Sequence, residues 1–204
     1  MVVRFGIVGT GNIGSQHIQL LLSGKIKGAV LAATASRSAP ALQTGVPHFK
    51  DYREMFDNAD IDAVLIATPT MNHAEMAQQA IERGLPIMME KPLAMSVLQA
   101  EMLLALVPDK LQFAVMLSQR FHPAYAKLKQ LLMDDAIGNL QRVGWTMTTW
   151  YRPDIYYQVS NWRGTWPGEG GGLLINQCIH NLDVLQWLPG VPNSITANVG
   201  FGKH

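Results

Sequence analysis

The amino-acid sequence predicts an α/β fold with a doubly wound parallel sheet. Strand-like and helix-like segments alternate through the first 120 residues, and one strand runs directly into a glycine-rich turn and a helix. The composition then changes, because all 5 tryptophans lie after residue 120. We therefore expect one domain over residues 1–120 and a second over residues 121–204.

Composition and charge exclude several classes of protein. Of the 204 residues, 48% are hydrophobic and 15% are charged, which is typical of a folded globule. The net charge of +1 without a basic run argues against a nucleic-acid or membrane surface. A single cysteine, Cys178, excludes an internal disulfide and a cysteine-based metal cluster, and we expect no metal. The early strand leaves no room for a signal peptide, so we expect a cytoplasmic location.

The turn after the first strand reads Gly9-Thr10-Gly11-Asn12-Ile13-Gly14. In a strand–turn–helix context, Gly9 permits the tight turn, Gly11 lets a pyrophosphate approach the backbone, and Gly14 lets the helix pack closely on the strand. The helix would then direct its free N–H groups at the phosphates. The pattern predicts a dinucleotide-binding turn, and a purely structural glycine turn is the alternative.

The second strand, residues 29–36, ends in Ser36 and Arg37. An NAD site usually has an acidic residue here, but this sequence has none between Arg4 and Asp51. Arg37 could instead stack on the adenine or pair with a 2′-phosphate, with Ser36 donating a hydrogen bond, which favours NADP over NAD. The alternative is that Arg37 is an ordinary surface arginine.

Further strands are expected at residues 63–68, 87–89 and 111–117, with helices at 73–83 and 96–107. Ligands bind at the carboxyl ends of such strands, so we expect one cofactor cleft lined by five strand ends. These ends are Gly9–Gly14, Ser36–Arg37, Thr68-Pro69-Thr70, Glu90-Lys91-Pro92 and Ser118-Gln119-Arg120. Lys91 could donate to a substrate oxygen with Glu90 orienting its ammonium, although a solvated ion pair is the commoner outcome for adjacent residues.

The second half predicts a helix from His122-Pro123 to near Gly138, a β-rich run over residues 140–150 and a strand over 194–200. The glycine run at residues 170–172 precedes a helix that would place Asn176 and His180 on one face, with Asp183 three residues further on. An amide, an imidazole and a carboxylate on one face could bind a substrate and move a proton. A buried helix whose polar side chains bond their neighbours is the alternative.

Taken together and in order, the glycine turn, Thr68-Pro69 with His73, Glu90-Lys91-Pro92 and the glycine-to-histidine segment resemble the Gfo/Idh/MocA oxidoreductases. The resemblance implies a Rossmann domain and an α+β domain whose open sheet covers the nicotinamide and often forms the oligomer interface. Family members are longer, so on this comparison residues 121–204 form an incomplete α+β domain that lacks most of its open sheet. We expect a homo-oligomer, or a compromised product of truncation. The sequence departs from the family at Asn176, which is often Asp there, and at Cys178, which is often glycine.

The expected site follows from both lines of reasoning. The predicted catalytic residues are Lys91, His180 and Asn176. The predicted substrate-binding residues are Lys91, Tyr157, Asn176 and His180. The predicted cofactor-binding residues are Gly9, Thr10, Gly11, Asn12, Ile13, Ser36, Arg37, Thr68, Pro69, His73, Glu90, Lys91, Gln119, Trp162 and Arg163, the last two by resemblance alone.

The resemblance implies an NAD(P)-dependent oxidoreductase that acts on a carbinol carbon of a sugar, sugar nucleotide or cyclitol. His180 would take the hydroxyl proton, Lys91 would stabilise the oxygen, and Asn176 would hold a substrate hydroxyl. Two alternatives stay open. One is a dinucleotide-binding sensor or remnant without catalysis. The other is a family enzyme of another type, such as a biliverdin reductase-like protein or a glycosidase that uses NAD transiently.

Overall fold

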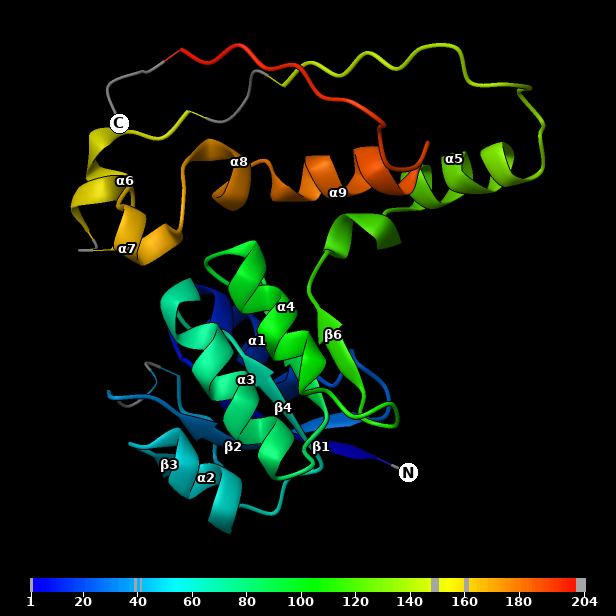
Figure 1. Cartoon of the computed structure of the whole chain (residues 1–204). Coiled ribbons are helices and arrows are strands. Elements are labelled where there is room, and N and C mark those ends of the chain that lie inside the picture. The colour runs from blue at the N-terminus through cyan, green and yellow to red at the C-terminus, as the bar shows by residue number, and fades with distance from the viewer. Residues whose placement is uncertain (1, 39, 41, 148–150, 160–161, 201–204) are drawn as a thin grey trace. The chain divides into compact units, whose positions relative to one another are not determined.

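The structure, a computed structural model, describes residues 2–38, 40, 42–147, 151–159 and 162–200. The chain divides into two compact units, Met1–Met116 and Leu117–His204, and each is described by itself. Figure 1 labels most of the helices and strands.

The first unit is built on a six-stranded sheet with the order β3-β2-β1-β4-β5-β6, in which every neighbouring pair is parallel. Its strands are β1 (Val3–Val8), β2 (Ala29–Ala35), β3 (His48–Phe49), β4 (Ala63–Ile66), β5 (Ile87–Met89) and β6 (Phe113–Val115). Both halves of the sheet start from β1 and β4 and run outward, so the prediction of a doubly wound sheet is confirmed. The two-residue strand β3 was not predicted, because a segment so short carries no periodicity.

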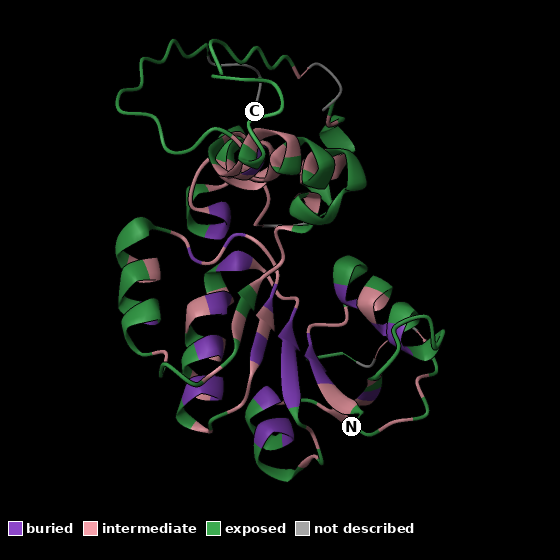
Figure 2. Ribbon diagram, turned by 90° about the vertical axis from the view of Figure 1, so that its right-hand side faces the viewer, coloured by how far each residue is buried: buried purple, intermediate pink, exposed green. Residues whose placement is uncertain are grey.

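Helices cover both faces of this sheet (Figures 1 and 2). They are α1 (Asn12–Leu22), α2 (Tyr52–Asn58), α3 (His73–Glu82) and α4 (Val97–Ala105), with a 3₁₀ turn, η1 (Thr70–Asn72). On one face, residues of α2, α3 and α4 form a core with Val64 and Ile66 of β4. On the other, Ile18 of α1 packs with Leu65. Since β4 is buried on both faces, it reads as a continuous apolar run.

Half of a capping box is formed at the start of α4. The Ser96 hydroxyl accepts from the Gln99 backbone N–H at 3.2 Å. The Gln99 side chain reaches one residue further back and accepts from the N–H of Met95 at 3.0 Å.

In the described residues of the second unit, the regular structure is helical. It comprises η2 (Ser118–Phe121), α5 (Pro123–Met133), α6 (Asp154–Gln158), α7 (Trp166–Glu169), α8 (Leu173–Asn176) and α9 (Ile179–Trp187). The strands predicted at 140–150 and 194–200 are not present in residues 140–147 and 194–200, which are irregular, and residues 148–150 lie outside the described ranges. A strand is stable only when a neighbour pairs its backbone groups, and no described residue of this unit supplies one.

The single helix predicted after the glycine run is also wrong, since α8 and α9 are separated at Gln177 and Cys178. The N–H of Cys178 bonds the carbonyl of Leu173 at 2.9 Å, five residues back instead of four. This wider turn ends α8 and restarts the chain as α9, so Asn176 and His180 do not share one continuous helix face.

Candidate functional site

The glycine turn of the first unit has the geometry that its three glycines were predicted to need. Gly9 has φ +91°, a conformation that side chains disfavour, and a Cβ there would lie 2.5 Å from the carbonyl oxygen of Ala67. A Cβ on Gly14 would lie 1.8 Å from the carbonyl oxygen of Gly9. The helix α1 can therefore pack this closely on the strand only because Gly14 has no side chain.

Gly11 differs from its two neighbours, because a Cβ built there meets no heavy atom within 4 Å. It is the N-cap of α1 and gives the helix no side-chain hydrogen bond, and no acidic residue occupies the first turn. The free N–H groups and the positive end of the helix dipole thus adjoin open space. These are the features that a pyrophosphate requires, so the residues present match a dinucleotide. The neighbouring Asn12 and Ile13 are exposed at the same helix start.

Two hydroxyl groups join the turn to the end of β2. The Ser36 hydroxyl donates to the carbonyl of Ser38 at 2.5 Å, and it also lies 2.7 Å from the hydroxyl of Thr10. Because Ser36 has only one proton to give, Thr10 donates to Ser36. The side chain of Arg37, the next residue, is exposed.

His73 joins the ends of β4 and β5. It is 1% exposed at the start of α3, and its two ring nitrogens lie 2.9 Å from the carbonyl oxygen of Thr68 and 2.8 Å from that of Pro92. Burial lowers the pKa of His73 below its ordinary value of 6.5, while the two carbonyls and the charge of Glu90 act in the opposite direction. A neutral imidazole has a single N–H and donates to one of these carbonyls at a time, and the ring lies between the two strand ends that carry Pro69 and Lys91.

The partner observed for Glu90 was not predicted. Its Oε1 lies 2.8 Å from Nε2 of His17 on α1, and both side chains are largely shielded from solvent. The sequence predicts only that this carboxylate orients the ammonium of Lys91. Lys91 is half-buried, and its bond to Pro92 is cis.

In the second unit, Asn176 at the end of α8 donates its side-chain amide to the carboxylate of Glu169. Glu169 is 5% exposed and ends the short helix α7. Its other oxygen accepts from the N–H of Gly164 at 3.1 Å. Sequence reasoning missed Glu169, because a lone glutamate before a glycine run carries no periodic or spacing signal.

His180 lies in the first turn of α9. Two cationic side chains, Arg120 and Lys129, hold this helix in place. Arg120 donates to both carboxylate oxygens of Asp183 at 2.7 and 2.5 Å, so this predicted member of the polar face is engaged by an arginine. Lys129 of α5 donates to the carbonyl of Trp187 at 2.8 Å, at the end of the helix where a cation is favourable.

The aromatic segment predicted to contact sugar and cofactor is packed on itself. The guanidinium of Arg163 lies 4.4 Å from the ring centre of Tyr156 and 4.6 Å from that of Trp162, and it donates to the Tyr156 hydroxyl. Tyr157 stacks edge-on against Tyr156 with centroids 5.1 Å apart. Gln119, a predicted cofactor residue, lies in η2 of this unit.

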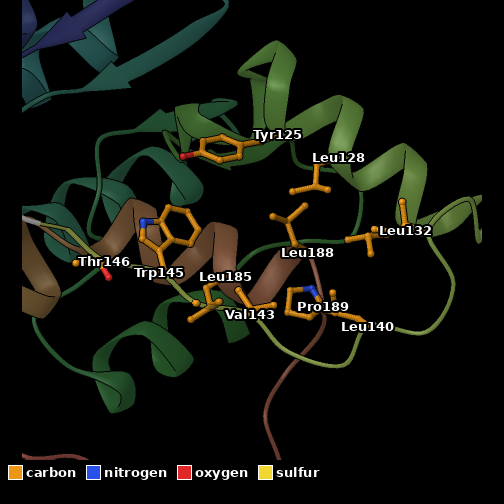
Figure 3. Close-up of a pocket in the computed structure, with 12 residues that line it drawn as sticks. Tyr125, Leu128, Leu132, Leu140, Val143, Trp145, Thr146, Leu185, Leu188 and Pro189 are labelled. Atoms are coloured by element: carbon orange, nitrogen blue, oxygen red, sulfur yellow. The ribbon is translucent and has the colours of Figure 1, made fainter.

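The second unit also has a cavity of about 400 Å³ between α5, the segment 137–146 and the end of α9 (Figure 3). Apolar side chains dominate its wall, including Leu128, Leu185 and Leu188. A polyol needs several convergent polar partners, so this cavity is not the candidate substrate site.

The described residues contain neither a metal centre nor a membrane span. No group of His, Cys, Asp and Glu side chains that could hold a metal ion occurs among them. Within the same ranges, every helix is too short or too polar to cross a membrane.

Comparison with known proteins agrees with this geometry. The model of the GFO/IDH/MocA oxidoreductase family, described as an NAD-binding Rossmann fold, matches residues 3–117. The model of a GFO/IDH/MocA C-terminal domain matches residues 125–204. The chain therefore belongs to the GFO/IDH/MocA oxidoreductase family, and the resemblance inferred from its motifs is confirmed.

Individual relatives give the same result. The chain is 32% identical to inositol 2-dehydrogenase of Arthrobacter sp. (strain FB24), covering 99% of this chain and 61% of that protein. It is 31% identical to inositol 2-dehydrogenase 2 of Paenarthrobacter aurescens (strain TC1), covering 94% of this chain and 57% of that protein. The chain thus spans about three fifths of the length of these relatives.

Solved structures match over both units. The WlbA dehydrogenase from Bordetella pertussis, in complex with NADH and UDP-GlcNAcA, has a TM-score of 0.81 at 28% identity, covering 93% of this chain and 59% of that one. The scyllo-inositol dehydrogenase from Lactobacillus casei, with NAD(H) and scyllo-inositol bound, has a TM-score of 0.75 at 26% identity, covering 92% of this chain and 56% of that one.

Proposed function

We propose that the protein is an NAD(P)-dependent oxidoreductase that transfers hydride between nicotinamide and a carbinol carbon of a sugar, sugar nucleotide or cyclitol. One observation supports the proposal above all. The backbone at Gly11, where α1 begins without a side-chain cap, borders open space, and the other two glycines of the turn are sterically required. A structural glycine turn would not need the open position. Membership of an oxidoreductase family supports the same conclusion.

Each residue of the proposed site has a separate role. The nicotinamide, when bound, supplies the hydride transfer. His180 accepts the proton of the substrate hydroxyl, for which an imidazole has a suitable pKa. Lys91 donates to the same oxygen and stabilises the charge that develops on it. Asn176 binds a neighbouring hydroxyl.

The proposal extends to the binding residues predicted from the sequence. The turn residues 9–13 bind the pyrophosphate, and Thr68, Pro69, Glu90 and Lys91 lie at the strand ends next to the nicotinamide. Tyr157 contributes to the substrate site, and Gln119, Trp162 and Arg163 contribute to the cofactor site.

We propose that NADP is preferred over NAD. Arg37 at the end of β2 is exposed, and the sequence has no acidic residue there to bind a ribose 2′-hydroxyl. The two solved relatives described above contain NADH or NAD(H), so NADPH and NADH must be compared directly.

The substrate class rests on the same relatives. Two of them are named inositol 2-dehydrogenases, and one was solved with the nucleotide sugar UDP-GlcNAcA. Asn176 in place of an aspartate excludes this side chain as a base, which leaves the proton transfer to His180.

The test has two stages. NADPH and NADH are first titrated by fluorescence, and the protein is then assayed with inositols, free sugars and nucleotide sugars. We expect saturable dinucleotide binding, turnover on at least one polyol, and a large loss of turnover in His180→Ala with unchanged dinucleotide affinity. Full turnover by His180→Ala would remove the proposed base. Saturable binding without turnover on any substrate would select the sensor, and no binding would reject both.

Two further properties belong to this proposal. We propose a homo-oligomer, because large apolar side chains are exposed in the second unit, including Phe121 at 86%, Trp166 at 77% and Ile195 at 82%. Size-exclusion chromatography with light scattering tests it, and a monomer at micromolar concentration would contradict it. We also propose a cytoplasmic location, which the single cysteine favours.

A further inference from the structure

Glu169 is a buried carboxylate to which neither the family comparison nor the sequence motifs give a role. It is 5% exposed, so its charge needs hydrogen-bond donors. Two donors are present: the backbone N–H of Gly164, at 3.1 Å from Oε2, and the side-chain amide of Asn176, which donates to Oε1. The second contact joins Glu169 to a proposed substrate-binding residue.

This contact determines the orientation of the Asn176 amide. An ionised carboxylate only accepts hydrogen bonds, so the atom of Asn176 that faces Glu169 must be the amide nitrogen. The two ends of a side-chain amide are hard to distinguish by shape alone, but here the chemistry of the partner decides. The carbonyl end of Asn176 is therefore directed away from Glu169.

The segment that carries Glu169 is held tightly. The hydroxyl of Thr165 donates to the carbonyl of Trp162 at 2.8 Å and accepts from the N–H of Gly168 at 3.1 Å. A Cβ on Gly168 would lie 2.2 Å from the carbonyl oxygen of Trp162, so the backbone at these two residues is in van der Waals contact and leaves no room for a side chain. Gly170, with φ +75°, then ends α7 directly after Glu169. The carboxylate thus has a fixed backbone position from which to hold Asn176.

We propose that Glu169 is a positioning residue that sets which end of the Asn176 amide faces the substrate. Asn176 then presents a hydrogen-bond acceptor, and its position selects a substrate group that donates, such as a ring hydroxyl. This inference rests on the proposed function, because it assigns a preference to the same substrate site.

The pairing also accounts for the departure of residue 176 from the family pattern. An aspartate at 176 would bring a second carboxylate against Glu169, and two adjacent carboxylates cannot both be ionised without a large cost. An asparagine supplies the donor that the buried carboxylate needs. The amide at residue 176 is therefore compatible with Glu169, and the two residues should be exchangeable as a pair.

The experiment is a double-mutant cycle with Glu169→Gln, Asn176→Asp and the double variant, in the full chain. In the double variant the donor and the acceptor are exchanged, so the introduced glutamine donates to the introduced aspartate. Melting temperatures at pH 8 are measured first, without any ligand. We expect Asn176→Asp to melt about 5 °C or more below wild type, and the double variant to recover most of that loss. Additive changes in melting temperature would overturn the pairing.

The second readout is steady-state kinetics with the substrate found in the screen. In Glu169→Gln the side-chain amide of Asn176 can rotate by 180° and present its nitrogen to the substrate. We therefore expect KM for the substrate to rise about tenfold, the equivalent of one hydrogen bond, with kcat changed less than about threefold. Dinucleotide affinity should not change. In the double variant the introduced carboxylate still presents an acceptor to the substrate, so KM should return to within about threefold of wild type.

The outcomes separate the two proposals. Recovery of the melting temperature without recovery of KM would overturn the selection of a donor group. Coupled melting temperatures in a protein that turns over no polyol would confirm that Glu169 holds Asn176 and would reject the oxidoreductase. If Glu169 accepts only from the N–H of Gly164, neither the melting temperature nor KM should recover in the double variant.

Discussion

Gly11 and Gly14 form a matched pair for testing the dinucleotide turn, because alanine has a different steric consequence at each. At Gly11 a new methyl group meets no heavy atom within 4 Å, and the backbone, at φ −69° and ψ −162°, is extended and open to alanine. At Gly14 the methyl group would lie 1.8 Å from the carbonyl oxygen of Gly9, so the helix must move. Only the first substitution leaves the position of α1 unchanged.

The magnitudes follow from these contacts. Gly11→Ala should change the free energy of unfolding by less than about 1 kcal/mol, in the stabilising direction if at all. It should nevertheless weaken dinucleotide binding about 100-fold, since a methyl group in the open space removes two charge-assisted N–H contacts with the pyrophosphate, together about 3 kcal/mol. Gly14→Ala should cost about 1–3 kcal/mol of stability through overpacking and lower the melting temperature by about 2–12 °C.

The assay measures thermal unfolding by circular dichroism and the dissociation constants of NADPH and NADH by fluorescence for wild type and both variants. Gly14→Ala is the control that shows what a displaced helix does to both quantities. If Gly11→Ala melts like wild type and binds the dinucleotide as tightly, the phosphates do not approach the turn, and the proposed function loses its main support.

Three other predictions concern single side chains. Because burial lowers the pKa of His73 in the fold, the unfolded chain takes up this proton first as the pH falls below 6.5, so stability should fall there by up to about 1.4 kcal/mol per pH unit. Urea unfolding at pH 7.5 and 5.5 should show a smaller fall for His73→Gln, and an equal fall would contradict the assignment. Burial also raises the pKa of the Cys178 thiol, which is 6% exposed, so labelling by a disulfide reagent should be at least about tenfold slower in the native protein than in urea. Arg37→Ala should weaken NADPH binding about tenfold and NADH binding less than about twofold, and equal losses would remove the preference for NADP.

The fold of the first unit could be predicted because its signals are local and repeat along the chain. Buried parallel strands read as apolar runs, as in Ala63–Ile66, and glycines at fixed spacing mark the turn into α1. The same reasoning failed over residues 140–147 and 194–200, where a β-rich composition is present but no partner strand is described. Strand propensity depends on a neighbour, which the local sequence does not contain.

The candidate site shows a similar division. Motif spacing identified Gly11, Lys91, Asn176 and His180, and their roles stay predictions until they are tested. It did not identify Glu169, because a buried carboxylate is recognised only once its burial and its donors are known. Nor did it reveal the wider turn at Cys178, which depends on a single backbone hydrogen bond.

The pairing of Glu90 with His17 has a consequence for the whole cofactor site. His17 lies on α1, the helix whose first N–H groups adjoin Gly11, and Glu90 lies directly before Lys91. One hydrogen bond of 2.8 Å therefore links the helix that would hold the pyrophosphate to the strand end that would hold the nicotinamide. His73 adds a second link, from the loop after β4 to the loop after β5. Both histidines make these contacts just beyond the ends of the strands. The hydrogen bonds of the sheet no longer hold the backbone there, so the histidines help to fix the position of Lys91.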